Sequence, residues 1–407
     1  MLAAGGLLIL MAMGYAVSGM VADGDDGAAA QDTAGAADPD APELSDGTAI
    51  TGNSDLLTLL FEDEDDTPAD TPQEDGGDLT PQQVDVDSGE TSPPATMGDD
   101  AASNGGGLLI EGTEGNDTLT GTDGDDTLDG YAGDDLLDGG TGDDLLRGRE
   151  GMDSLLGGGG NDAITGGPGD DRIEGGTDTD MLVGNEGNDT ILGGAGADEA
   201  YGEDGDDLID GGTGTDFLVG GDGHDTITGG TDDDLLFGND GDDSLSGEDG
   251  DDYLQGGFGA DTLSGGAGND RLDGTFAAGD SLFGPVDEDQ GDILDGGDGD
   301  DTIVVGAGDL ATGGAGADLF ATGSFIQAAE LAGTVTDFDA AQDVIEVMFD
   351  PALTPDPVIT VQDFPDGSGA HILFNGDIIL SVSGAQGLDP ALIQLRSVTL
   401  DAVAETA

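Results

Sequence analysis

The chain of 407 residues contains no cysteine, no tryptophan and no lysine, and its five basic residues are all arginines. A scaffold held together by disulfides is excluded, because it would need cysteines. A binder of nucleic acid or of anionic membranes needs a positive face, which five arginines among 92 acidic residues cannot supply. Aromatic residues make up 4% and apolar residues 35% of the chain, which is thin for the core of an ordinary enzyme of this length.

The net charge of the chain is −87, and glycine contributes 80 residues. A chain with so much charge and so little hydrophobicity normally stays disordered. The alternative is that a cation neutralises the charge as the chain folds. Acidic residues are absent from residues 1–22, whereas 23–107 hold 23, 108–318 hold 56 and 319–407 hold 13. These changes divide the chain into four segments.

The first two segments precede any regular pattern. Residues 1–22 are apolar and just long enough to span a bilayer at ~1.5 Å rise per residue. They lack the basic n-region of a secretory signal. A signal or membrane anchor and a short apolar tail with no membrane role therefore both remain open. Residues 23–107 are rich in Asp, Ala, Gly and Pro, and we expect a disordered acidic linker there.

A nine-residue period begins at residue 112. Its most regular member is an aspartate, which we name the register aspartate. From Leu119 to Leu272 an aliphatic residue follows it two positions later, with Ala200 as the one small exception, and a glycine always precedes it by five positions. The period loosens at Phe276–Gly279 and Pro285–Gln290, which we expect to bulge from the fold, and returns afterwards. The register aspartates are Asp117, Asp126, Asp135, Asp144, Asp153, Asp162, Asp171, Asp180, Asp189, Asp198, Asp207, Asp216, Asp225, Asp234, Asp243, Asp252, Asp261, Asp270, Asp301 and Asp318.

The unit is G-G-x-G-x-D-x-U-x, in which U is aliphatic, as in Gly157–Thr165 and Gly220–Thr228. It resembles the calcium-binding nonapeptide of RTX (repeats-in-toxin, hemolysin-type) proteins. In that family two nonapeptides form one coil of a parallel β-roll, with calcium ions between stacked loops. The resemblance implies an all-β, calcium-stapled parallel β-roll solenoid over residues 108–318. Eighteen uninterrupted repeats would form about nine coils, roughly 43 Å long at ~4.8 Å per coil.

The residue types of the repeat suit calcium, which takes 6–8 oxygen ligands, chiefly carboxylates and carbonyls. The x-U-x tripeptide is a minimal strand with U pointing inward. We expect the register aspartates and loop carbonyls to bind multiple Ca²⁺ ions, about 16 if one ion lies between each pair of stacked loops. An EF-hand or a phosphate-binding loop would need helices, which this glycine content disfavours. Plain disorder is the remaining alternative.

The last segment, residues 319–407, regains apolar and β-branched residues, and we expect a C-terminal β cap that covers the end of the roll. Val335–Val347 resembles the roll-closing segment of the serralysin-type metalloprotease C-terminal domain. Asp366-Gly367 and Asn375-Gly376-Asp377 predict hairpin turns. The family resemblance also implies a type I secretion signal, which we place at Leu395–Ala407.

No catalytic site is expected in this chain. It has two histidines and no H-E-x-x-H motif, so the metalloprotease site is missing. His224 occupies a variable loop position, where we expect it to be exposed, and His371 lies in a predicted strand of the cap. No G-x-S-x-G nucleophile elbow is present.

Outward side chains of alternate repeats share one sheet, and part of that sheet carries an apolar stripe. Contiguous apolar patches often mark contacts, so we expect the stripe to dock another roll, a cell-surface polymer or the cap. Ordinary β-propensity is the alternative explanation. The stripe consists of Met181, Val183, Tyr201, Phe217, Val219, Leu235, Phe237 and Tyr253.

The sequence therefore predicts a secreted, extracellular, non-catalytic calcium-binding protein that folds outside the cell when calcium binds. Association with a membrane or cell surface through residues 1–22 remains open. The alternatives are a calcium-dependent adhesin or matrix protein, and an accessory or degenerate member of a secreted hydrolase family.

Overall fold

The computed structural model describes residues 83–85, 106–275, 291–323 and 332–398. The chain divides into two units, Met1–Asp78 and Leu79–Ala407, and all described residues lie in the second.

Several expectations fall outside the described residues. These are the apolar segment 1–22, most of the linker 23–107, the bulges expected within 276–290 and the end of the secretion signal at 399–407. In the part of the chain that is described, no helix is long and apolar enough to cross a membrane.

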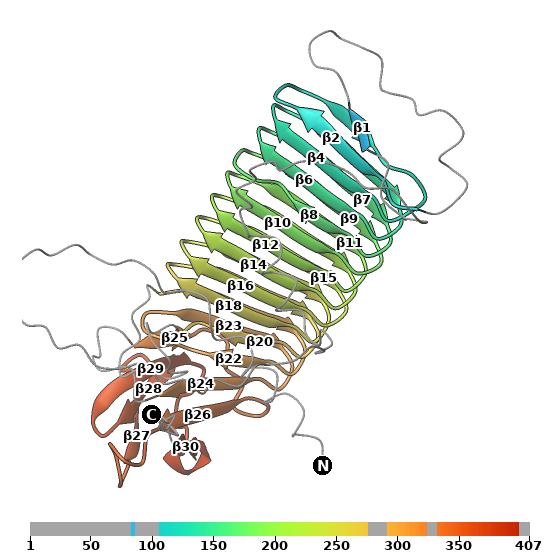
Figure 1. Ribbon diagram of the computed structural model, residues 1–407. Coiled ribbons are helices and arrows are strands. Elements are labelled where there is room, and N and C mark those ends of the chain that lie inside the picture. Colours follow the sequence, from blue (N-terminus) through green and yellow to red (C-terminus); the bar gives the residue numbers. More distant parts are fainter. Residues whose placement is uncertain (1–82, 86–105, 276–290, 324–331, 399–407) are drawn as a thin grey trace, which may run out of the picture. The chain divides into compact units, whose positions relative to one another are not determined.

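Strands of the second unit form two 15-stranded sheets, and through the roll the chain alternates between them. Figure 1 shows the strands of each sheet stacked along the roll. Sheet A consists, in order, of β1 (Gln83–Asp85), β2 (Leu109–Thr113), β4 (Thr127–Ala132), β6 (Leu145–Glu150), β8 (Ala163–Thr165), β10 (Met181–Glu186), β12 (Glu199–Asp204), β14 (Phe217–Asp222), β16 (Leu235–Asp240), β18 (Tyr253–Phe258), β20 (Arg271–Asp273), β22 (Thr302–Val304), β24 (Leu319–Gly323), β26 (Val344–Phe349) and β30 (Gln394–Ser397).

Sheet B contains the strands that alternate along the chain with those of sheet A. It consists, in order, of β3 (Thr118–Thr120), β5 (Leu136–Thr141), β7 (Ser154–Gly159), β9 (Arg172–Thr177), β11 (Thr190–Ala195), β13 (Leu208–Thr213), β15 (Thr226–Thr231), β17 (Ser244–Asp249), β19 (Thr262–Ala267), β21 (Ile293–Asp298), β23 (Leu310–Ala315), β25 (Gly333–Val335), β29 (Asp377–Ser383), β28 (Gly369–Phe374) and β27 (Ile359–Asp363). Among the described residues one 3₁₀ turn, η2, spans Pro390–Leu392.

Neighbouring strands of the roll are parallel and 18 residues apart, so Leu218 lies between Ala200 and Leu236. This register confirms the predicted all-β parallel β-roll, which has about 11 turns. The irregular stretch of sequence falls in one long coil, since Leu272 pairs with Ile303. The next coil is one residue short, because Ile303 pairs with Phe320. In both coils an inward residue still pairs with an inward residue, so the change in coil length is taken up outside the strands. A slip of one residue within a strand would instead exchange its inward and outward faces.

One inward side chain per repeat forms the core of the roll. The aliphatic residues that follow the register aspartates are at most 2% exposed from Leu119 to Leu272, Ala200 included. Outward neighbours in the strands contrast with them, since Leu208 is 46% exposed and Ile209 is fully buried. The x-U-x tripeptide therefore has the predicted orientation.

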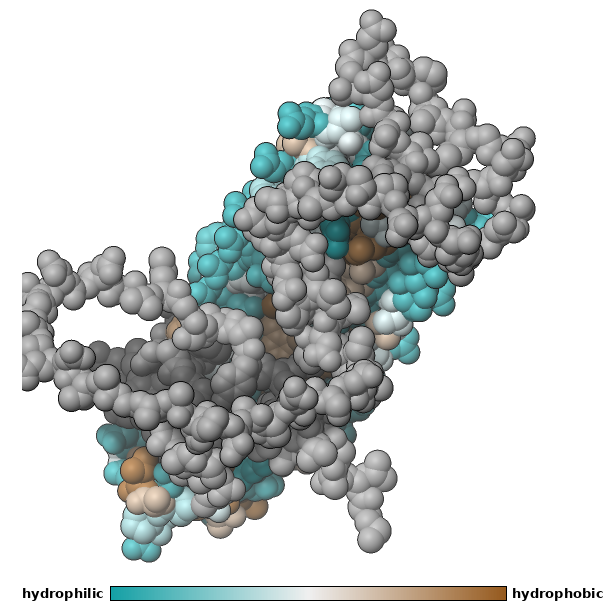
Figure 2. Space-filling model, viewed as in Figure 1, coloured by the Kyte–Doolittle hydropathy of each residue, from teal (hydrophilic) through white to brown (hydrophobic). Residues whose placement is uncertain are grey.

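The coil stack continues into the predicted cap, because β24, β26 and β30 extend sheet A and β25 and β29 extend sheet B in parallel. Antiparallel pairing is confined to β27, β28 and β29, and the turns between them lie at the two predicted positions. Asn375 and Gly376 have φ values of 53° and 101°, as a tight hairpin turn requires. The rings of Phe320 and Phe338 lie 6.3 Å apart and join the last coils to the cap. In Figure 2, hydrophilic residues dominate the visible parts of the roll, and hydrophobic residues appear at the cap end.

The alternation of the core gives a matched test of the fold. Ile209→Ala should lower the free energy of unfolding of the calcium-saturated protein by about 2–4 kcal/mol, because it leaves a cavity in the single inward column. Leu208→Ala, one residue away and outward, should change it by less than about 0.5 kcal/mol. Urea denaturation followed by circular dichroism measures both, and equal losses would contradict the assigned register.

Candidate metal sites

The register aspartates form two ladders along the edges of the roll. Each backbone N–H of a register aspartate donates to Oδ1 of the aspartate one coil later, as from Asp198 to Asp216 and from Asp216 to Asp234, both at 2.8 Å. The sheet A ladder, whose members precede strands of sheet A, is Asp126, Asp144, Asp162, Asp180, Asp198, Asp216, Asp234, Asp252, Asp270, Asp301 and Asp318. The sheet B ladder is Asp117, Asp135, Asp153, Asp171, Asp189, Asp207, Asp225, Asp243, Asp261, Asp292 and Asp309.

The structure buries nearly all the predicted aspartates. From Asp126 to Asp318 each is at most 3% exposed, whereas Asp117 at the start of the roll is only partly buried. Two ladder members, Asp292 and Asp309, were not among the predicted residues. A nine-residue count from Asp270 misses them, because the long coil interrupts the period. Each still has a glycine directly before it and a buried apolar residue two positions after it, which is Leu294 for Asp292 and Ala311 for Asp309.

The second carboxylate oxygen of most ladder members is buried without a hydrogen-bond donor. Buried polar atoms in folded proteins are almost always hydrogen-bonded, so a whole row of exceptions calls for a missing partner. These oxygens are Oδ2 of Asp135, Asp144, Asp153, Asp162, Asp171, Asp180, Asp189, Asp198, Asp207, Asp216, Asp225, Asp234, Asp243, Asp252, Asp261, Asp270 and Asp301.

A backbone carbonyl faces the same space as these carboxylate oxygens. A Cβ atom built on Gly211 would collide with Oδ2 of Asp216 and would lie 2.8 Å from the carbonyl oxygen of Gly229 in the next coil. Glycine five positions before the aspartate therefore keeps open a small space bordered by two oxygens and no donor. Carboxylate and carbonyl oxygens are the donor set that calcium prefers. At Asp318 the ring of Phe320 borders the corresponding space, since a Cβ atom built on Gly313 would lie 2.9 Å from Cζ of Phe320.

Side chains alone do not complete a chelating site. Among the described residues no group of three or more His, Cys, Asp or Glu side chains could hold a metal ion. No basic side chain of the described residues forms an ion pair with a ladder aspartate. The four ion pairs found there join arginines to Asp129, Glu174, Asp273 and Glu346. Backbone carbonyls must therefore supply many of the ligands of any ion at the ladders.

Burial shifts the ionisation of the ladder carboxylates. The pKa of Asp216 is raised to about 7, chiefly by desolvation and also by the nearby charges of Asp198, Asp210 and Asp232, although the hydrogen bond from the N–H of Asp198 opposes the shift. The pKa of Asp171 rises to about 8 for the same leading reason. A row of neighbouring carboxylates with raised pKa values marks a fold that is destabilised at neutral pH unless positive charge enters it.

A second row of side chains lies at the loop surface, one residue before the register aspartates. There the N–H of His224 donates to Oδ1 of Asp206 at 3.0 Å, and the N–H of Asp242 donates to Nδ1 of His224 at 2.9 Å. His224 is exposed, in agreement with the prediction. This outer row is hydrogen-bonded in the opposite direction along the roll and remains in contact with water.

The apolar stripe is brought together on sheet A. The rings of Tyr201, Phe217, Phe237 and Tyr253 follow one another at centroid distances of 5.5 to 5.9 Å, and Arg271 lies over Tyr253. Val183 departs from the expected exposure, since only 2% of it is accessible. The other stripe residues are half-buried, which stacking of each ring on its neighbour explains in part.

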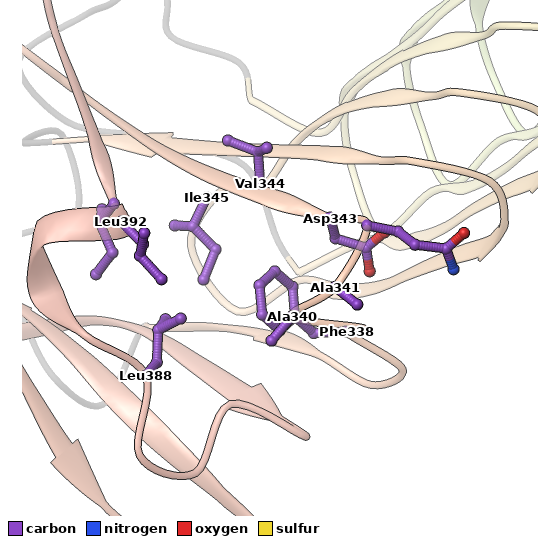
Figure 3. A pocket seen from close by; sticks show the side chains of 10 residues that line it. Phe338, Ala340, Ala341, Asp343, Val344, Ile345, Leu388 and Leu392 are labelled. Carbon is purple, nitrogen blue, oxygen red and sulfur yellow. The ribbon is translucent and has the colours of Figure 1, made fainter.

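A pocket of about 250 Å³ lies in the cap (Figure 3). Phe338, Ile345, Leu388 and Leu392 line it, so its wall is mainly apolar. Both oxygens of Asp343 at its rim already accept backbone N–H groups, from Asp318 and Asp339. Asp343 therefore has no open carboxylate oxygen comparable to those of the ladders.

Comparison with known proteins agrees with this geometry. Residues 111–276 and 288–309 match the family model of the RTX calcium-binding nonapeptide repeat. The chain thus carries RTX calcium-binding repeats across residues 111–309. No curated protein matches the chain. The resemblance of Val335–Val347 to the serralysin-type closing segment stays a prediction.

The raised pKa values predict how the calcium-free roll responds to pH. Folded carboxylates with pKa values of about 6–8, against 3.8 ordinarily, bind protons that the unfolded chain releases. Their contribution to stability is complete below about pH 4 and is lost as the pH rises through about 6 to 8. With calcium chelated, acidification from about pH 8 to about pH 5 should increase the β signal in far-UV circular dichroism. Saturating calcium should flatten this dependence. A β signal that falls on acidification would contradict the assignment.

Proposed function

We propose that the protein is a secreted, non-catalytic calcium-binding protein whose roll folds outside the cell when calcium binds. The observation that carries the proposal is the row of buried Oδ2 atoms, each without a donor and beside a loop glycine. A cation is the partner that such oxygens lack. Because carboxylates of one sign cannot stack uncompensated, ion binding and folding of the roll would be a single event.

The residues that would hold calcium are the register aspartates with open Oδ2 atoms, from Asp135 to Asp270, together with Asp301. Carbonyl oxygens of loop glycines, such as Gly229 beside Asp216, would complete the ligand set. Residues 108–318 hold 56 acidic and only four basic residues, so most of the positive charge that balances the carboxylates would come from the ions. Low calcium inside the cell and high calcium outside would then keep the chain unfolded until export.

The hydrolase alternative has little support among the described residues. Nδ1 of His371 lies 3.1 Å from Oγ of Ser381 on the neighbouring strand, and the ring of His371 packs edge-on against Phe364. No carboxylate is hydrogen-bonded to this histidine among the described residues. Such a pair lacks the third group that orients the base of a serine hydrolase.

The adhesin alternative rests on the stripe of sheet A. Its four aromatic rings form a continuous column, and aromatic side chains supply much of the energy of protein contacts. Five coils at ~4.8 Å give a patch too narrow for the ~800 Å² that each partner buries in a standard interface. Docking through the stripe, whether to a second roll or to a polymer, therefore stays a prediction.

Calcium titration tests the proposed function. Millimolar calcium should convert the chain from a coil to a β spectrum in circular dichroism, and magnesium should not. Asp216→Asn should raise the calcium concentration at the midpoint and cost about 1–3 kcal/mol of stability, because it alters a buried ligand. Asp210→Asn removes the same charge from an exposed position in the same coil and serves as the control. The absence of any calcium-induced transition would refute the proposal.

A further inference from the structure

The first two register positions differ from those inside the roll. Oδ2 of Asp117 accepts the N–H and the hydroxyl of Thr113 at 2.6 and 2.8 Å, and Oδ2 of Asp126 accepts those of Thr122 at 2.6 and 3.0 Å. Each threonine lies four residues before its aspartate. The chain itself therefore closes these two carboxylates, whereas the register aspartates from Asp135 to Asp270, and Asp301, leave Oδ2 without a donor.

The backbone at the threonines explains the difference. Inside the roll the residue four before the aspartate has a left-handed conformation, as Gly212 does before Asp216 with φ of 102°. Its N–H then points along the roll, as that of Gly167 does in donating to the carbonyl of Gly184 at 3.0 Å. Thr113 and Thr122 have no positive φ, because a β-branched residue adopts that conformation only at a high cost. Their N–H groups turn to the carboxylate instead.

We propose that Thr113 and Thr122 take the place of cations, so that Asp117 and Asp126 bind no calcium and the first coil closes the N-terminal end of the roll without calcium. This rests on the proposed function of the inner ladder. An oxygen that already accepts two hydrogen bonds has no lone pair left for a metal, and the donor groups next to it repel a cation. The two ions that the nine-residue pattern assigns to these positions are absent.

Similar local bonds occur at the far ends, at Asp309, the last member of the sheet B ladder, and at Asp343, whose Oδ1 accepts the N–H of Asp318, the last member of the sheet A ladder. Oδ2 of Asp309 accepts the N–H of Gly306 at 2.5 Å, and Oδ2 of Asp343 accepts the N–H of Asp339 at 2.6 Å. In all four cases the donor lies three or four residues before the carboxylate. A solenoid needs ends that do not depend on a neighbouring coil, and a local hydrogen bond meets that need.

A pair of matched double variants of the full chain tests the proposal. Asp207→Asn with Asp216→Asn alters two open positions, and Asp117→Asn with Asp126→Asn alters the two closed ones. Equilibrium dialysis gives the calcium bound per chain at saturation, and circular dichroism gives the folding midpoint. We expect the interior variant to lose bound calcium and to need more calcium to fold. The terminal variant should keep the calcium content of the wild type, with faster amide exchange confined to the first coil.

Equal losses of calcium in the two double variants would overturn the proposal. Thr113→Gly with Thr122→Gly gives a second readout that does not alter the carboxylates, since it restores the G-G pair of the interior repeats. Bound calcium should then increase, whereas Thr118→Gly with Thr127→Gly, in the neighbouring strands, should leave it unchanged. An unchanged calcium content in the first threonine variant would also overturn the proposal. A wild type that binds no calcium would refute the proposed function itself.

Discussion

The structure depends on one electrostatic constraint, which is the stacking of identical buried carboxylates. Parallel coils place each register aspartate over the next, and the bond from N–H to Oδ1 fixes their register, as between Asp198 and Asp216. The same bond leaves Oδ2 buried beside oxygens of like charge. Desolvation and mutual repulsion then oppose folding at neutral pH, as the raised pKa values show. A positive charge from outside the chain resolves this conflict, since the chain has no lysine and none of the ion pairs among the described residues joins an arginine to a ladder carboxylate.

The glycines and the thin core follow from the same constraint. A side chain on Gly211 would fill the space between Asp216 and Gly229, so the position admits no Cβ. Each repeat contributes one inward aliphatic residue, such as Ile209 or Leu218, and the column that results is narrow. A core of this size buries little apolar surface per residue, which leaves stability to depend on what binds at the edges of the sheets.

The nine-residue period was enough to predict the coils, the inward residues and most of the ladder. It missed two members of the ladder, which come after the long coil. Asp292 and Asp309 belong to the ladder because the long coil returns the strand to register, not because of their spacing. Asp117 and Asp126 have the expected spacing, but the residue four positions before each has a different backbone conformation. The spacing of a repeat does not give the φ angles of its residues. The burial of Val183 likewise depends on packing that a strand pattern does not contain.

The two rows of side chains at the loops, both of which contain aspartates, show that negative charge by itself does not define a metal site. The outer row contains Asp206 and the inner row contains Asp207, one residue apart in sequence. Asp206 accepts the N–H of His224 from the following coil and keeps its other oxygen in water, which stabilises the charge without an ion. Asp207 accepts an N–H from the preceding coil and has its other oxygen buried. Burial without a donor therefore distinguishes the proposed ligand Asp207 from its neighbour Asp206. The same criterion is the basis of our proposal that Asp117 and Asp126, which have donors, close the end of the fold and bind no metal.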